Sequence, residues 1–127
     1  MIEAKNVNVS IGRKLILQEL NFSAAPGEVT AIVGPNGSGK STLVKALSGD
    51  LPYQGEIAYN DRELMELKPA EAAALRAVLP QTATLSFPYT VREVVRLGLL
   101  GGHAGQDEHL PERALARVDL GGFAGRF

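Results

Sequence analysis

Residues 34–42 read Gly34-Pro35-Asn36-Gly37-Ser38-Gly39-Lys40-Ser41-Thr42. The first eight match the pattern G-x-x-x-x-G-K-[ST] at every fixed position. Backbone N–H groups surround a polyphosphate only where the chain approaches closely, and side chains at Gly37 or Gly39 would obstruct that approach. A helix beginning here would aim unpaired N–H groups and its positive dipole end at the same anion. The stretch therefore predicts a loop that binds the phosphates of a nucleotide.

Two side chains of this loop are expected to contact the nucleotide and its metal ion directly. Lys40 carries a mobile positive charge, which we expect at the β- and γ-phosphates in a catalytic role. Ser41 offers a hydroxyl to Mg²⁺, a hard cation that takes few protein ligands. We therefore expect ATP and Mg²⁺ as cofactors. The predicted nucleotide-binding residues are Gly34, Pro35, Asn36, Gly37, Ser38, Gly39, Lys40, Ser41 and Thr42.

The sequence on either side of the loop favours this interpretation. Residues 29–33 form a short run rich in β-branched side chains, which predicts a strand buried on both faces. Residues 41–47 have the apolar spacing of a helix, and Gly49 follows as its end. The alternative is a glycine-rich surface turn with a solvated lysine. Because the motif is expected between a strand and a helix, the flanks favour phosphate binding.

The rest of the chain divides into a β-rich beginning and a mostly helical end. Apolar residues that alternate with polar ones, and short apolar runs, predict the strands. Helical spacing, a proline in a first turn and the capping box Thr90–Glu93 predict the helices. The predicted strands are 7–11, 20–24, 55–59 and 77–79, and the further helices are 69–76, 91–98 and 110–121.

Composition restricts the class of protein. The chain has 127 residues, of which 45% are hydrophobic and 21% charged, as is typical of a globular protein of ordinary domain size. The formal charge of −1 is dispersed, so no basic surface for nucleic acid is expected. The absence of cysteine excludes disulfides, thiolate nucleophiles and cysteine-ligated metals, and it fits a reducing cytosol. No apolar run reaches a membrane-spanning length, so we expect any membrane role to come through a partner.

The loop and its surroundings resemble the ATP-binding subunits of ABC transporters. Residues 34–43 resemble the Walker A segment, and residues 17–28 resemble the lead-in to it. Val78-Leu79-Pro80-Gln81 resembles the Q-loop, which implies that Gln81 senses the γ-phosphate and Mg²⁺ in a catalytic and metal-binding role. The resemblance implies an α/β fold, the P-loop NTPase fold of the ABC ATPase type. It also implies that 1–81 belong to the ATP-binding core and 82–127 begin a helical subdomain.

Within that family the chain looks most like the heme (hemin) import ATPases. The similarity lies in residues 76–81, in Phe87-Pro88-Tyr89-Thr90-Val91 and in residues 94–98. It implies ATP binding and hydrolysis coupled to heme import. It also implies a homodimer of ATP-binding subunits attached to integral-membrane permease subunits at the cytoplasmic face of the inner membrane, with a periplasmic or lipoprotein heme-binding protein acting indirectly. An ATPase of a ferric-siderophore or cobalamin importer is the alternative.

Two departures from the family pattern bear on activity. Ile11 stands where many members stack adenine on an aromatic residue, so an apolar contact without a π-face is expected. The sequence also lacks the family's signature, the Walker B aspartate, the catalytic glutamate and the switch histidine. We therefore expect an incomplete ATPase that carries the phosphate-binding half and is inactive alone.

Two further hypotheses come from other classes of protein. One is a soluble P-loop kinase for a small metabolite, which would need an arginine-rich lid over the phosphates. Arg113, Arg117 and Arg126 are too dispersed to support such a lid. The other is a nucleotide-binding fragment that does not hydrolyse ATP.

Overall fold

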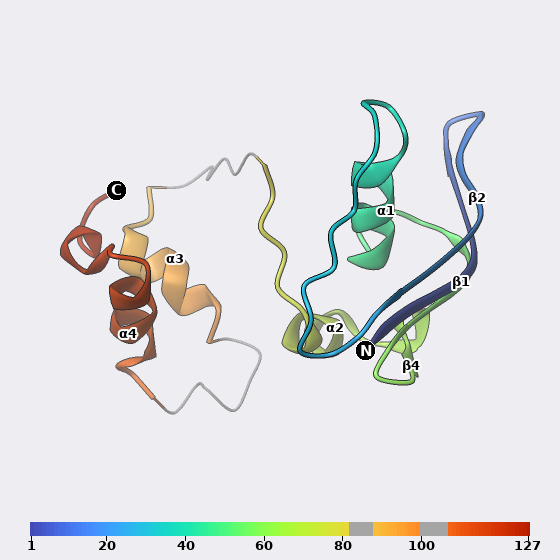
Figure 1. Ribbon diagram of the computed structural model, residues 1–127. Helices are drawn as coiled ribbons and strands as arrows, with labels where there is room; N and C mark the ends of the chain where they lie inside the picture. The colour runs from blue at the N-terminus through green and yellow to red at the C-terminus, as the bar shows by residue number, and fades with distance from the viewer. Residues whose placement is uncertain (82–87, 100–106) are drawn as a thin grey trace. The chain divides into compact units, whose positions relative to one another are not determined.

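The computed structural model describes residues 1–81, 88–99 and 107–127 (Figure 1). The chain forms two compact units, Met1–Arg76 and Ala77–Phe127, and each is described by itself. Phe87 and most of the loop predicted after Gln81 lie outside the described residues. None of the helices in these three ranges is long and apolar enough to cross a membrane.

The first unit is built on a four-stranded antiparallel sheet with the order β2-β1-β3-β4. This sheet confirms the β-rich beginning predicted from the alternating residues. The long β1–β2 hairpin closes at the pair Ile11 and Lys14, and Ala4 of β1 lies opposite Ile57 of β3. The strands are β1 (Ile2–Ile11), β2 (Lys14–Ala24), β3 (Gln54–Tyr59) and β4 (Arg62–Glu63).

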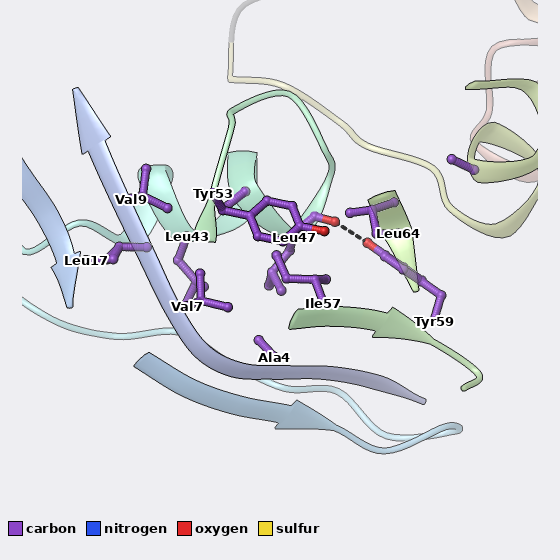
Figure 2. Close-up of a cluster of buried hydrophobic side chains, with 12 residues drawn as sticks. Ala4, Val7, Val9, Leu17, Leu43, Leu47, Tyr53, Ile57, Tyr59 and Leu64 are labelled. Carbon is purple, nitrogen blue, oxygen red and sulfur yellow. Dashed lines mark hydrogen bonds between the residues drawn. The ribbon is translucent and has the colours of Figure 1, made fainter. Parts of the chain in front are cut away.

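One face of this sheet packs against helix α1 (Lys40–Leu47) to form the core (Figure 2). Val7 and Ile57 are completely buried there. The Tyr59 hydroxyl donates a hydrogen bond of 2.6 Å to the Leu47 carbonyl. That bond occupies a carbonyl that the end of a helix leaves without an intrahelical partner. The core thus holds α1, and with it the beginning of that helix, in a fixed place on the sheet.

Two short helical segments complete this unit. A 3₁₀ turn, η1 (Leu64–Glu66), leads into α2 (Pro69–Leu75), with Leu64 and Ala72 buried. The predicted helix 69–76 is confirmed to within one residue, and its proline lies in the first turn as expected.

The two strands predicted at 29–33 and 77–79 are not formed, and these predictions are wrong. Val29 is 99% exposed, Val33 87% and Leu79 96%. Figure 1 draws both stretches as plain trace. A strand in the interior of a sheet is stabilised by backbone hydrogen bonds to its neighbouring strands. None of the described residues pairs in this way with either stretch. The α/β class is confirmed, but an extended segment takes the place of the strand before the loop.

The second unit contains α3 (Val91–Leu97), α4 (Leu110–Arg117) and the 3₁₀ turn η3 (Gly121–Phe123). An ion pair of 2.6 Å joins Arg92 of α3 to Glu112 of α4. The last segment of the chain contacts the beginning of α3, where the Val91 N–H donates to the Arg126 carbonyl at 2.8 Å. The helix predicted at 110–121 ends earlier, at Arg117.

The capping box predicted at the beginning of α3 is confirmed. The Thr90 hydroxyl oxygen accepts a bond from the Glu93 N–H at 3.4 Å, and the Thr90 N–H donates to the Glu93 carboxylate at 2.8 Å. The Thr90 hydroxyl also donates to that carboxylate at 2.7 Å. Two backbone donors that the helix end would leave unpaired are thereby satisfied.

We expect this capping box to make the stability of α3 depend on pH. Hydrogen bonds from the Thr90 hydroxyl and the Thr90 N–H hold the pKa of Glu93 below its ordinary value of 4.5. A carboxyl group whose pKa is lowered by folding stabilises the folded state at pH values above its ordinary pKa. This stabilisation is lost as the pH falls through the lowered pKa. An NMR titration of the carboxyl group measures this pKa. Titration at or above 4.5 would contradict the prediction, and Glu93→Gln should remove this part of the pH dependence.

Candidate phosphate-binding site

The predicted loop ends at Gly39, which caps α1 with φ 91° and ψ 6° and no side-chain hydrogen bond. The first intrahelical bond runs from the Leu43 N–H to the Gly39 carbonyl at 2.8 Å. The N–H groups of Lys40, Ser41 and Thr42 make no hydrogen bond to any described residue. These three donors converge at the positive end of the helix, where an anion is favoured.

Gly39 also brings the loop into contact with β2. Its φ lies in the left-handed region that favours glycine. A Cβ atom at this position would lie 2.9 Å from Leu17 Cδ2 and 3.5 Å from Ile16 Cγ2. This glycine therefore serves the packing of the hairpin against the loop. The motif alone did not predict that contact, because it is made with side chains distant in the sequence.

Lys40 lies within the curve of the loop. Its Nζ atom donates to the carbonyls of Gly34 and Pro35, each at 2.7 Å. An ammonium group has three donors, so one remains for another acceptor. Within the loop the Ser38 N–H donates to the Pro35 carbonyl at 3.3 Å, which closes a turn. The Lys40 ammonium is thus bonded to the beginning of the predicted loop, at Gly34 and Pro35.

A cleft of about 290 Å³ adjoins the loop. Leu17, Leu20 and Ile32 belong to its apolar wall, and loop residues, Lys40 among them, form the other side. Figure 1 shows the loop and the closed end of the β1–β2 hairpin at the same end of this unit. The arrangement offers cationic and N–H donors next to apolar surface, which suits a ligand with a phosphate chain and an apolar ring system.

The other predicted residues are placed as follows. Ser41 is exposed in the first turn of α1, beside the unpaired N–H groups. Ile11 is 53% exposed at the end of β1. Gln81 is exposed and belongs to the second unit, so its catalytic and metal-binding roles stay predictions.

The residues present fit ATP and Mg²⁺. The phosphates would meet three free N–H donors and Lys40, and Mg²⁺ would meet the Ser41 hydroxyl. No group of three or more His, Cys, Asp or Glu residues in the described ranges could hold a metal ion. A Mg²⁺ ion bound by one hydroxyl, phosphate oxygens and water needs no such group.

Comparisons with known proteins identify the family of the chain. The model of the ABC transporter family matches residues 17–127. The chain is 68% identical over its whole length to the hemin import ATP-binding protein HmuV of Chelativorans sp. (strain BNC1), of which it covers 49%. It is 63% identical to the protein of the same name from Mesorhizobium japonicum, of which it covers 50%. The chain therefore spans about half the length of these curated relatives.

Solved structures show the same similarity in three dimensions. The ATP-binding subunit of an ABC transporter superposes with a TM-score of 0.80 and 27% identity, over 99% of this chain and 53% of that one. A nucleotide-free ATP-binding cassette from an ABC transporter superposes with a TM-score of 0.77 and 26% identity, over 98% of this chain and 56% of that one. With the family match over residues 17–127, these similarities lead to one conclusion: the chain belongs to the ABC transporter family.

Proposed function

We propose that this chain is the phosphate-binding portion of an ATP-binding subunit that drives hemin import. One observation carries the proposal. Three N–H groups at the beginning of α1 that bond to no described residue lie in the same loop as the Lys40 ammonium. The hemin import proteins that are 68% and 63% identical to it support the choice of substrate.

The site supports a division of roles among its residues. The N–H groups of residues 40–42 bind phosphate oxygens, and Lys40 neutralises their charge. Ser41 would hold Mg²⁺ through its hydroxyl, and the metal would supply charge neutralisation at the phosphates. Because phosphoryl transfer needs positioning and charge stabilisation more than covalent chemistry, these groups are suited to it. Gln81 is proposed to sense the γ-phosphate and the metal.

Membership of the ABC transporter family supports a proposed assembly. Two ATP-binding subunits form a homodimer on the permease subunits, peripheral to the cytoplasmic face of the inner membrane, and a heme-binding protein delivers the substrate to the permease. In this proposal residues 1–81 belong to the core and residues 82–127 begin the helical subdomain. The rival kinase hypothesis gains no support from Arg113, because its guanidinium group pairs with Asp107 at 3.3 Å.

Hemin-dependent growth tests the proposed substrate. Because the chain spans about half the length of its hemin import relatives, it is joined to the part of the 68% identical protein that it does not cover. The gene for this chimera is introduced into a bacterium that requires external hemin and lacks the ATPase of its own hemin importer. Growth on hemin is expected with the natural sequence and with the control Lys45→Ala, but not with Lys40→Ala. Growth on a ferric siderophore or cobalamin in the corresponding deletion strains, without growth on hemin, would favour the alternative importers. Absence of growth on hemin, on the ferric siderophore and on cobalamin would contradict the importer assignment.

A further inference from the structure

A second cleft lies at the C-terminal end of α1, whereas the phosphate loop lies at the beginning of that helix. Its volume is about 470 Å³, within the roughly 300–1,000 Å³ of small-molecule sites. Gly49 and Leu51, which follow α1, belong to one side, and residues of η1 and α2 form the other. Leu64 and Ala72 of this wall are buried, and Leu51 packs against the same core. The core therefore holds a mostly apolar wall in place.

Arg76 brings a positive charge to this apolar cleft. The residue ends α2, is half-buried and belongs to the cleft wall. Its Nη1 atom is buried and has no hydrogen-bond partner among the described residues. Its Nη2 atom lies beside Gly49, where a Cβ atom would be 3.6 Å away. Because a guanidinium group in a protein keeps its proton, Arg76 presents this charge and the unused donor at every pH at which the chain is folded.

No acidic side chain in the described part of the chain forms an ion pair with Arg76. Asp50 also belongs to the cleft wall, but its carboxylate accepts a hydrogen bond from the Ser48 hydroxyl at 2.8 Å. The Glu63 carboxylate accepts from the Tyr53 hydroxyl at 3.1 Å. A buried donor without an acceptor is unfavourable, and the cost is larger when the group is charged. An anion that brings an acceptor to Nη1 of Arg76 would remove this cost.

We propose that this cleft binds a small organic anion that has an apolar body and one acidic group. The acidic group, a carboxylate or sulfonate, accepts from the planar guanidinium group of Arg76, which suits two oxygens side by side. The apolar body lies against Leu51, Leu64 and Met65, and it covers Met65, which is 62% exposed. The inference does not depend on the proposed function, because the phosphate loop lies at the other end of α1.

The test compares two dyes that have the same apolar rings and differ in charge. Anilinonaphthalene sulfonate carries a sulfonate, and phenylnaphthylamine has the same rings without it; both fluoresce more strongly on apolar surface than in water. Each dye is titrated into the full chain, into Arg76→Gln and into the control Arg117→Gln, which removes the same charge from an exposed residue of α4. Arg76→Gln should weaken the binding of the sulfonate dye about five- to thirtyfold and leave that of the neutral dye unchanged. Arg117→Gln should change neither affinity.

Competition distinguishes this cleft from the phosphate loop. Inorganic tripolyphosphate has the phosphate chain of ATP but no adenine, and it lacks the apolar body that the cleft requires. It should therefore leave the sulfonate dye bound. Displacement of the dye by tripolyphosphate would place the dye at the phosphate loop and overturn the inference, as would a natural chain that binds neither dye.

The variants can overturn the inference in two further ways. Equal affinity for the sulfonate dye in the natural chain and Arg76→Gln would show that water satisfies Arg76. Equal losses of both dyes would show that Arg76 serves only the shape of the cleft. If Arg76→Gln does not fold, Met65→Glu decides, because its exposed side chain places a negative charge at the cleft. Met65→Glu should weaken the sulfonate dye more than the neutral one, and an equal effect on both would contradict the proposal.

Discussion

Lys40→Ala should weaken ATP binding by about 1–3 kcal/mol, or roughly 5- to 150-fold in dissociation constant. The substitution removes the full positive charge from a loop where the ammonium contacts the Gly34 and Pro35 carbonyls. Both carbonyls belong to exposed residues, so water can replace the lost donors and the stability of the fold should change little. Titration of a fluorescent ATP analogue measures the affinity.

Lys45→Ala is the matched control for that substitution. Lys45 is exposed in the last turn of the same helix, so its removal changes the net charge equally without touching the loop. Lys40→Ala should weaken the binding of tripolyphosphate as much as that of ATP, because the Lys40 ammonium is expected to contact the phosphates. Equal ATP affinity in the natural chain and Lys40→Ala would refute the assignment of the phosphate-binding loop.

Ile57→Ala should lower the free energy of unfolding by about 2–5 kcal/mol, a large part of the roughly 5–15 kcal/mol typical of a domain. Ile57 of β3 is completely buried, and Figure 2 shows its side chain in the cluster that also contains Leu47 of α1. Its truncation removes apolar contacts and leaves a cavity that the packed sheet cannot close. Urea denaturation followed by circular dichroism measures the change.

Met65→Ala is the control for Ile57→Ala, since Met65 is 62% exposed and a surface substitution usually changes stability by no more than about 0.5 kcal/mol. A loss below about 1 kcal/mol in Ile57→Ala would mean that the sheet and α1 do not share one core.

Much of the fold could be predicted because the necessary interactions are local in sequence. Alternating residues placed β1 and β2, and the Thr90–Glu93 pair fixed the beginning of α3. The loop from Gly34 to Thr42 could be singled out in the sequence because phosphate binding requires a particular residue type at each fixed position of its motif. The roles of Ser41 and Gln81 stay predictions.

The failures share a different physical cause. Residues 29–33 have the composition of a buried strand, but a strand also requires neighbours that hydrogen-bond to it, and composition does not reveal them. The irregular positions Asn6 of β1 and Glu19 of β2, both with positive φ, were missed for a related reason. Alternation was read separately in each strand, whereas the hydrogen bond from the Glu19 N–H to Asn8 Oδ1 joins the two strands. Asparagine readily adopts positive φ, so Asn6 carried a signal that the pattern of apolar residues concealed.

The exposed segment before the phosphate loop has a consequence for the proteolysis of this chain. Residues 29–33 present two fully or nearly exposed valines, Val29 and Val33, on backbone without ladder partners. Proteases and other partners that add a strand to an unpaired backbone require no unfolding to bind such a stretch. Limited proteolysis of this chain should therefore cut within 29–33. A cut there would separate β2 from the phosphate loop while the core still held α1 on the sheet.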